Sequence, residues 1–452
     1  MATIWFETAL TARGWQDKVR VTLAEGRIAK LETEVEPGPD DLRGGVALPG
    51  LCNVHSHAFQ RGMAGLTEYR GASRDDFWSW RELMYRFLGR MGPEEMQAIA
   101  AFAFAEMLEG GFTRVGEFHY LHHAPDGAPY ADLGEMAARI AAAAEATGIG
   151  LTLLPVYYAQ GGFDGAAPTE GQRRFLNSVD RYALLLERSR AAIAHLEGAN
   201  LGVAPHSLRA ALPDDLAQVV ALGAGGPVHI HAAEQVKEVA DCLAATGKRP
   251  VQWLLDNTAL DAHWCLIHAT HLDPEETRAL AASGAVAGLC PVTEANLGDG
   301  IFPAAAYLGA GGRFGVGTDS NIAISAPAEL RGLEYSQRLS HQARNVLASL
   351  ERSTGARLFH GALAGGAQAL GVSGRGLEQG EAADLVSLDA QHPDLFGRRG
   401  DALLDSLVFG LGRDVIDGVW RAGRQVVRQG RHIERDRLLA DYRRALAKVL
   451  DA

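Results

Sequence analysis

The centre of the chain alternates short apolar, β-prone segments with Ala- and Leu-rich segments of helical pattern. This alternation restricts the possible folds more than any other feature. The β-prone segments are 113–117, 151–157, 201–204, 228–231, 265–268, 285–289 and 314–317, and helical patterns at 93–109, 133–147 and 274–282 lie between them. Repeated strand–helix units imply parallel strands, because a parallel neighbour is reached only through a crossover connection. About eight such units predict an α/β fold of the (β/α)8 barrel type.

Strand patterns also occur at both ends of the chain. Residues 19–23 and 27–31 flank a Glu25-Gly26 turn, and residues 383–389 alternate like a strand before a hairpin that turns at Ala422-Gly423. We expect residues 1–48 and 370–435 to form one small β-sandwich domain, residues 49–369 to form the barrel, and residues 436–452 to form a C-terminal helix.

Composition restricts the class of protein and the compartment. The 452 residues are 47% hydrophobic and 22% charged, which is typical of a soluble protein with a large core. A net charge of −12 argues against a nucleic-acid partner and gives no reason to expect a membrane partner. Neither a signal peptide nor an apolar run of about 18 residues is apparent. The four cysteines form no Cys-X-X-Cys and are expected to be reduced thiols, so we expect a cytoplasmic protein.

Histidines and one aspartate stand where predicted strands end. His55 and His57 follow an apolar run, and alternate residues of a strand point to one face, so both imidazoles can reach one ion. His231, His268 and Asp319 end three further predicted strands. A single strand-end histidine is more often a hydrogen-bonded structural residue, and Gly-Thr-Asp-Ser also suits a helix cap. Because barrel enzymes carry their chemistry at these strand ends, the coincidence favours one metal site.

These motifs resemble those of the amidohydrolase superfamily, in its branch of metal-dependent deaminases. The matching residues are His55-X-His57, His231-Ala-Ala-Glu234, His268 and Thr318-Asp319. The resemblance covers nearly the whole chain. It implies a distorted (β/α)8 barrel and a divalent metal ion held by His55, His57, His231 and Asp319. By the same pattern His229 is a structural residue.

The expected number of metal ions is one. Two-metal members of the superfamily bridge their ions with a carboxylated lysine, and this chain has no lysine between Lys30 and Lys237. Glu117 is the remaining candidate for a bridge, but deaminases of this type use one metal. Nitrogen and carboxylate ligands suit Zn²⁺, and Fe²⁺ or Mn²⁺ fit the same set.

The resemblance also implies catalytic roles for three residues. Asp319 is expected to accept the proton of the attacking water, His268 to orient that water, and Glu234 to protonate the substrate nitrogen and then the departing amine. The alternative for Glu234 is an exposed helix carboxylate.

The loops after the strands suggest a substrate. Residues 58–65, 76–85, 117–120 and 204–209 resemble deiminases of this branch that convert N-formimino-L-glutamate to N-formyl-L-glutamate and ammonia in bacterial histidine breakdown. Arginine binds carboxylates bidentately, so Arg81 and Arg209 are candidates for the two carboxylates of a small anionic substrate. Gln60, Tyr120 and His206 are candidates for further hydrogen bonds. The aromatic residues at 77–80 would close over the ligand, contact a second subunit, or only pack.

Two other functions stay open at this point. A deaminase of a purine, pterin or related heterocycle would use the same metal site, with aromatic stacking and amide contacts in place of paired arginines. A non-catalytic assembly protein on this fold would have lost metal ligands, and here all are present. Family habit suggests a homodimer.

Overall fold

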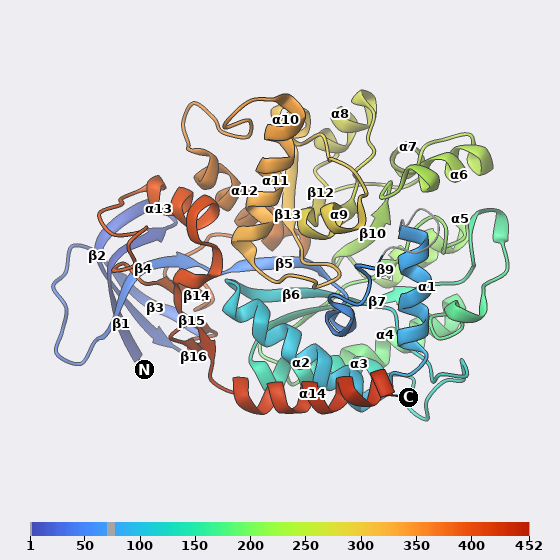
Figure 1. The fold of residues 1–452 in the computed structure, drawn as a ribbon, viewed down its shortest axis with the longest axis horizontal. Helices are drawn as coiled ribbons and strands as arrows, with labels where there is room; N and C mark the ends of the chain where they lie inside the picture. The colour runs from blue at the N-terminus through green and yellow to red at the C-terminus, as the bar shows by residue number, and fades with distance from the viewer. Residues whose placement is uncertain (1, 70–76, 452) are drawn as a thin grey trace.

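The computed structural model describes residues 2–69 and 77–451, which form a parallel barrel beside a separate sheet (Figure 1). The barrel strands are β5 (Leu51–Ser56), β6 (Phe112–His119), β7 (Gly150–Tyr157), β8 (Asn200–Leu201), β9 (Ala204–Pro205), β10 (Val228–Ala232), β11 (Trp264–His268), β12 (Val286–Leu289) and β13 (Arg313–Val316). They pair in parallel in chain order, and a Val316–Asn53 pair joins β13 to β5. A bridge between Val203 and Val228 joins the β8–β9 segment to β10 and closes the barrel. The predicted α/β barrel is confirmed.

The fourth barrel strand is interrupted, whereas the sequence predicted one strand over 201–204. Gly202 N–H donates to the Leu153 carbonyl (3.0 Å), after which the parallel ladder requires a donor from residue 155. Residue 155 is proline, which has no N–H. The chain therefore bonds to the segment just before β10 instead, where the Val203 N–H donates to the Pro227 carbonyl (2.9 Å). Pairing with β7 resumes in β9.

Helices surround the barrel. The α-helices are α1 (Phe77–Leu88), α2 (Pro93–Glu109), α3 (Glu135–Thr147), α4 (Val179–Ile193), α5 (Pro213–Leu222), α6 (Val236–Thr246), α7 (Pro250–Asn257), α8 (Pro274–Ser283), α9 (Pro291–Leu297), α10 (Ala304–Gly309), α11 (Ala326–His341), α12 (Thr354–Ala369) and α13 (Asp401–Ser406). Shorter 3₁₀ or π turns are η1 (Ala58–Met63), η2 (Phe163–Gly165), η3 (Glu170–Gln172), η4 (Leu407–Leu411) and η5 (Gly412–Val415). Helix α12 packs very closely on β13: a Cβ added to Gly365 would lie 1.9 Å from the Phe314 carbonyl oxygen.

The second sheet is built from both chain ends, as expected. Its strands are β1 (Ala2–Thr11), β2 (Gly14–Ala24), β3 (Arg27–Glu32), β4 (Leu42–Pro49), β14 (Leu385–Leu388), β15 (Ile416–Arg421), β16 (Arg424–Arg428) and β17 (Arg431–His432). The strand order is β17-β16-β15-β14-β4-β1-β2-β3, so β4 and β14 join the two ends, antiparallel to each other. The chain passes from β4 through Gly50 directly into the first barrel strand. The exact domain limits stay a prediction.

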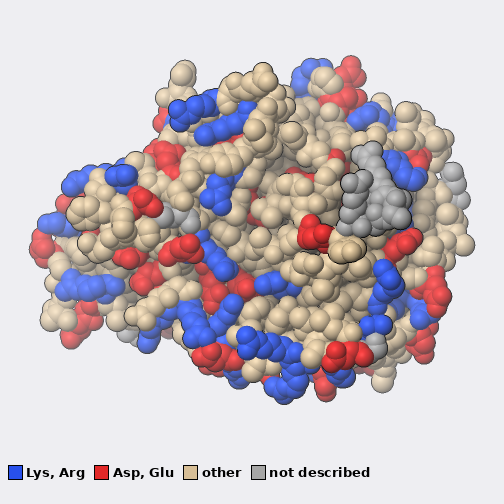
Figure 2. Space-filling model, viewed as in Figure 1, with Lys and Arg blue, Asp and Glu red and all other residues tan. Residues whose placement is uncertain are grey.

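The last helix, α14 (Arg435–Asp451), lies along α2 (Figure 1). The Tyr442 ring stacks on Phe102 with centroids 4.4 Å apart, and the Arg435 guanidinium pairs with Glu109 at 2.7 Å. On the face shown in Figure 2, basic and acidic side chains are interspersed. Among the described residues, no helix combines the length and the apolar character that a membrane span requires.

Candidate metal and active site

Three imidazoles and one carboxylate converge at the carboxyl ends of the barrel strands. His55 lies in β5, His57 directly follows it, His231 lies in β10 and Asp319 follows β13. The Nε2 atoms of His55 and His231 are 3.1 Å apart. The Asp319 Oδ1 atom lies 3.4 Å from the His57 Nε2 and 3.5 Å from the His55 Nε2. All four side chains are buried.

The Nδ1 hydrogen bonds of His57 and His231 direct the Nε2 lone pairs of these two rings toward the cluster. The Nδ1 atoms of His57 and His231 lie 2.9 and 3.0 Å from the carbonyl oxygens of Phe118 and His206, so each Nδ1–H donates there. His55 Nδ1 has no partner among the described residues. Burial lowers the pKa of His55, His57 and His231, so the rings are neutral. Neutral imidazole lone pairs and a carboxylate crowded at this spacing fit a divalent cation.

The backbone at the site is strained. Ala233, His268 and Asp319 have φ values of 53°, 68° and 43°, in the left-handed region that disfavours residues other than glycine. Buried Asn321 supports this backbone, because its side-chain amide donates to the carbonyls of His57 (3.1 Å) and Asp319 (3.0 Å). The ends of the first and last barrel strands are thereby tied together.

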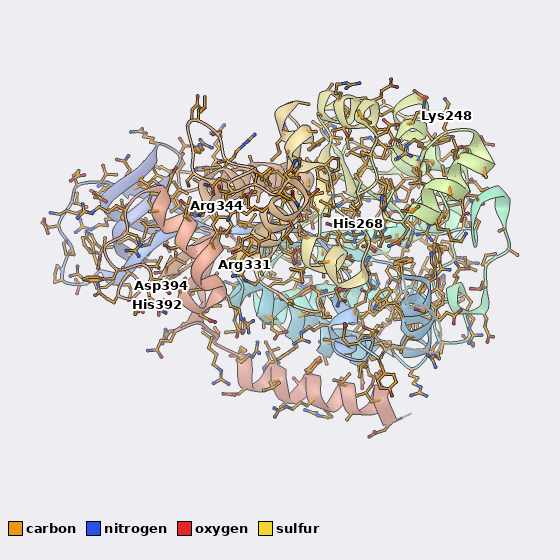
Figure 3. All side chains as sticks on the ribbon, turned by 45° about the horizontal axis from the view of Figure 1, so that its top comes forward. Lys248, His268, Arg331, Arg344, His392 and Asp394 are labelled. Carbon is orange, nitrogen blue, oxygen red and sulfur yellow. The ribbon has the colours of Figure 1, made fainter. Side chains whose placement is uncertain are left out.

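His268 and Glu234 stand beside the four candidate ligands. His268 lies inside the barrel domain, whereas Lys248 lies at its periphery (Figure 3). The His268 Nε2 is 3.7 Å from Asp319 Oδ2 and 3.8 Å from Glu234 Oε1. Burial raises the pKa of Glu234 to about 7, against the opposing effect of His268. Burial alone would lower the pKa of His268, but Glu234, Glu294 and Asp319 raise it to about 10.

Two carboxylates that contact this pair were not predicted from the sequence. Glu294 Oε1 lies 3.2 Å from the His268 Nδ1 and accepts from the Cys290 N–H (2.8 Å). Glu238 Oε2 accepts from the backbone N–H of Glu234 (3.0 Å). The sequence offered one indication of these two glutamates, which is their position: each follows the end of a barrel strand, near the start of the next helix.

A cavity opens beside His268 and brings the predicted substrate residues together. Its lining includes Gln60, Arg81, Tyr120, His206 and Arg209 with His57, His231, Glu234, His268 and Asp319; the remaining lining residues are Phe77, Trp80, Met84, Tyr85, Tyr158, Phe175, Thr293, Leu297 and Ser320. Asp76, the first residue of the predicted loop 76–85, lies outside the described residues. The candidate metal ligands, catalytic residues and substrate-binding residues therefore line the same cavity.

Neither arginine of the cavity forms an ion pair among the described residues. Burial lowers the pKa of Arg209, but the more distant Glu238 and Glu234 carboxylates help to raise it above its usual value. Within the described residues, neither Arg81 nor Arg209 has a carboxylate oxygen within 4.0 Å. Their Nε atoms are buried and have no hydrogen-bond partner there. Arg209 is only 8% exposed. Two guanidinium groups in this condition are ready to bind anionic groups that enter the cavity.

The uncharged polar candidates are also held in place. Gln60 Nε2 donates to the Tyr120 hydroxyl (3.0 Å), which lies 3.7 Å from Met84 Sδ. Gln60 Oε1 has no partner among the described residues. The His206 Nδ1 lies 3.0 Å from the Ser207 hydroxyl.

Two further residues considered from the sequence lie away from the cavity lining. His229 Nε2 donates to the Ala369 carbonyl at 2.7 Å, so its ring points away from the cluster. Glu117 accepts from the Ala58 N–H at 2.8 Å. Neither lines the cavity.

Comparison with known proteins identifies a family for each part of the chain. Residues 46–426 match the model described as Amidohydrolase family. Residues 1–45 match the model described as Formimidoylglutamate deiminase HutF, N-terminal domain. The second match covers β1 to β3 and the start of β4.

Individual relatives agree with these matches. The formimidoylglutamate deiminase of Pseudomonas aeruginosa is 50% identical over 454 residues, covering 100% of both chains. A 5-methylthioadenosine/S-adenosylhomocysteine deaminase of Natronomonas pharaonis is 29% identical over 367 residues, covering 78% of this chain and 75% of its own. The crystal structure of an amidohydrolase from Brucella melitensis is 55% identical and superposes with a TM-score of 0.96 over 100% of both chains. An adenosine deaminase structure from Xanthomonas campestris shares the fold, with a TM-score of 0.80 at 22% identity over 100% of this chain and 99% of its own.

Proposed function

The chain belongs to the amidohydrolase family, and from this membership we propose that it hydrolyses N-formimino-L-glutamate to N-formyl-L-glutamate and ammonia in histidine degradation. Water adds to the carbon of the carbon–nitrogen double bond, the bond from that carbon to the imino nitrogen breaks, and the nitrogen leaves as ammonia. The observation that carries the substrate assignment is the pair of arginines Arg81 and Arg209, which line the cavity beside the histidine cluster, have unpartnered buried Nε atoms and form no ion pair among the described residues.

Amidohydrolases are metal-dependent, and we assign one divalent ion, Zn²⁺ first and Fe²⁺ or Mn²⁺ as substitutes, to this site. His55, His57 and His231 would bind it through Nε2, and Asp319 through a carboxylate oxygen. Such an ion lowers the pKa of water bound to it toward about 7.

The remaining steps belong to side chains of the protein. Asp319 accepts the proton of the attacking water through its carboxylate. His268 orients that water, because its Nε2 lies between the carboxylates of Asp319 and Glu234. Glu234 carries a proton at Oε1 to the imino nitrogen, and burial suits it to this task by raising its pKa to about 7.

The substrate is held through its two carboxylates. Arg81 and Arg209 bind one each through paired N–H donors. Gln60, Tyr120 and His206 donate to the carboxylate or formimino groups at the inner part of the cavity. The four free cysteines agree with a reducing cytoplasm, and we expect a homodimer from the family.

The test is ammonia release from N-formimino-L-glutamate by zinc-loaded protein, with S-adenosylhomocysteine and 8-oxoguanine measured beside it. Turnover of the first compound alone supports the proposal. Turnover of a heterocycle alone would keep the metal chemistry and overturn the substrate, an outcome that the 29% identical deaminase makes the second candidate. Arg209→Met protein serves as the control, because it removes a carboxylate-binding group and leaves the metal ligands intact.

A further inference from the structure

Three cations from separate segments surround one indole ring beside the cavity. The guanidinium carbons of Arg81 and Arg209 lie 4.5 and 5.5 Å from the ring centroid of Trp78. The ammonium of Lys237 lies 5.6 Å from the same centroid and pairs with Asp241 at 2.6 Å. Arg81 and Trp78 belong to α1, Arg209 to the loop after β9 and Lys237 to the first turn of α6.

The arrangement brings three cations to one ring, and of these only Lys237 forms an ion pair among the described residues. Arg81 and Arg209 have no counter-ion within 4.0 Å in the part of the chain that the structure describes. Two neighbouring guanidinium groups repel each other, and burial of Arg209 weakens the screening by water, while the Glu238 and Glu234 carboxylates offset part of this repulsion. The face of an indole ring attracts cations, and tryptophan does so best among the aromatic side chains.

Trp78 contacts both arginines but does not itself line the cavity. Helix α1 contributes Phe77, Trp80, Arg81, Met84 and Tyr85 to the lining, and Trp78 is not part of it. We propose that Trp78 is a positioning residue: it holds the guanidinium groups of Arg81 and Arg209 side by side, so that the cavity selects a linear dicarboxylate. This inference rests on the proposed function, because the two arginines act there as the carboxylate-binding pair.

The same arrangement also disfavours heterocyclic substrates. A heterocycle deaminase needs an aromatic surface on which its substrate stacks. Here the ring of Trp78 is already occupied by cations, and the second ring on Arg81, that of Tyr85, lies 5.6 Å from the same guanidinium. The rings of Trp78 and Tyr85 are therefore engaged by guanidinium groups.

The experiment compares Trp78→Leu and Trp78→Phe with Trp253→Leu, a matched loss of a half-buried tryptophan on α7, away from the cavity lining. Three quantities are measured on zinc-loaded protein: KM and kcat for N-formimino-L-glutamate, and the calorimetric Kd for glutarate, which has two carboxylates and no formimino group. Trp78→Leu is expected to raise KM and the glutarate Kd about tenfold each, with kcat within about twofold. Trp78→Phe, which keeps a weaker aromatic face, is expected to raise both about threefold, and Trp253→Leu neither.

The pattern distinguishes positioning from simple structural support. A Trp78→Leu protein whose kcat falls while KM and the glutarate Kd stay at wild-type values would overturn the proposal, as would no change in any constant. In an Arg81→Met background the effect of Trp78→Leu on the glutarate Kd should shrink to about threefold or less, because the two changes act on one contact. If Trp78→Leu fails to fold, unchanged constants in Trp78→Phe overturn the proposal and a rise in both supports it. Wild-type protein that binds glutarate but leaves N-formimino-L-glutamate intact would refute the proposed function and leave the glutarate test of Trp78 valid.

Discussion

Replacing Glu234 by glutamine is expected to abolish most activity and, at the same time, to stabilise the protein at alkaline pH. Glu234 is 4% exposed, and burial raises its pKa from 4.5 to about 7. The folded protein therefore holds this proton more tightly than the unfolded chain does. The stability linked to the proton is fully present below about pH 4.5 and is lost as the pH rises through about 7.

The size of the effect follows from the pKa difference. At pH 8 the ionised carboxylate costs about 3 kcal/mol of the free energy of unfolding. Glutamine has nearly the same shape and does not ionise. With an unfolding entropy of about 0.9 kcal/mol per kelvin for a chain of 452 residues, Glu234→Gln should melt about 3 °C higher than the wild type at pH 8 and within about 1 °C of it at pH 5. Loss of a general acid should lower kcat by about 10²–10⁴-fold.

The melting temperatures are measured after chelation, because a bound cation would change the field around Glu234. Ammonia release is measured on zinc-loaded protein. Glu275→Gln, an exposed change on α8, is the matched control and should alter neither quantity. A Glu234→Gln protein that melts at or below the wild type at pH 8 would refute the burial argument. A kcat within tenfold of the wild type would refute the proton-transfer role.

Four further outcomes are expected. Arg209→Met should raise KM at least tenfold with kcat nearly unchanged, since a charge-assisted hydrogen bond contributes about 1.5–3 kcal/mol; steady-state kinetics decide, and an unchanged KM contradicts the role. Zinc at 1,000 times its Kd should raise the melting temperature of chelated protein by about 4 °C and restore activity, and His55→Gln should weaken both responses. Glu294→Gln should lower kcat without raising KM, since it contacts His268 and does not line the cavity; a rise in KM alone would argue against this. Gly365→Ala should lower the free energy of unfolding by at least about 2 kcal/mol, because the new Cβ would lie 1.9 Å from a backbone oxygen; an unchanged urea midpoint would show that α12 moves freely.

The sequence was most informative where a local pattern determines the contact. His55 and His57 share a strand face by the period of two, and Asp319 ends another parallel strand, so their convergence follows from the barrel itself. The alternation of strand and helix likewise predicted the barrel, and the strand patterns at 19–31 and 383–427 predicted a sheet from both ends.

Contacts that depend on tertiary register were not predictable. Glu294 reaches His268 only because α9 begins directly after β12, and Trp78 meets Arg209 only because α1 packs over the loop after β9. The break after Gly202 depends on which residue of the neighbouring strand would have to donate the next bond of the ladder, namely Pro155. The substrate and the superfamily were identified by resemblance to known proteins, because the spacing of residues alone does not identify either. The roles of the individual site residues stay predictions.

The pairing of β4 with β14 has a consequence for synthesis on the ribosome. β4 ends at Pro49, and its partner β14 begins at Leu385, so 335 residues are translated between them. At about 5–20 residues per second, the open edge of β4 waits roughly 17–70 s for its partner. During that interval the nascent chain offers an unpaired strand, rich in backbone donors and acceptors, to any other extended chain nearby. The chain is therefore most exposed to misassembly while its barrel is emerging and before its last strands are made.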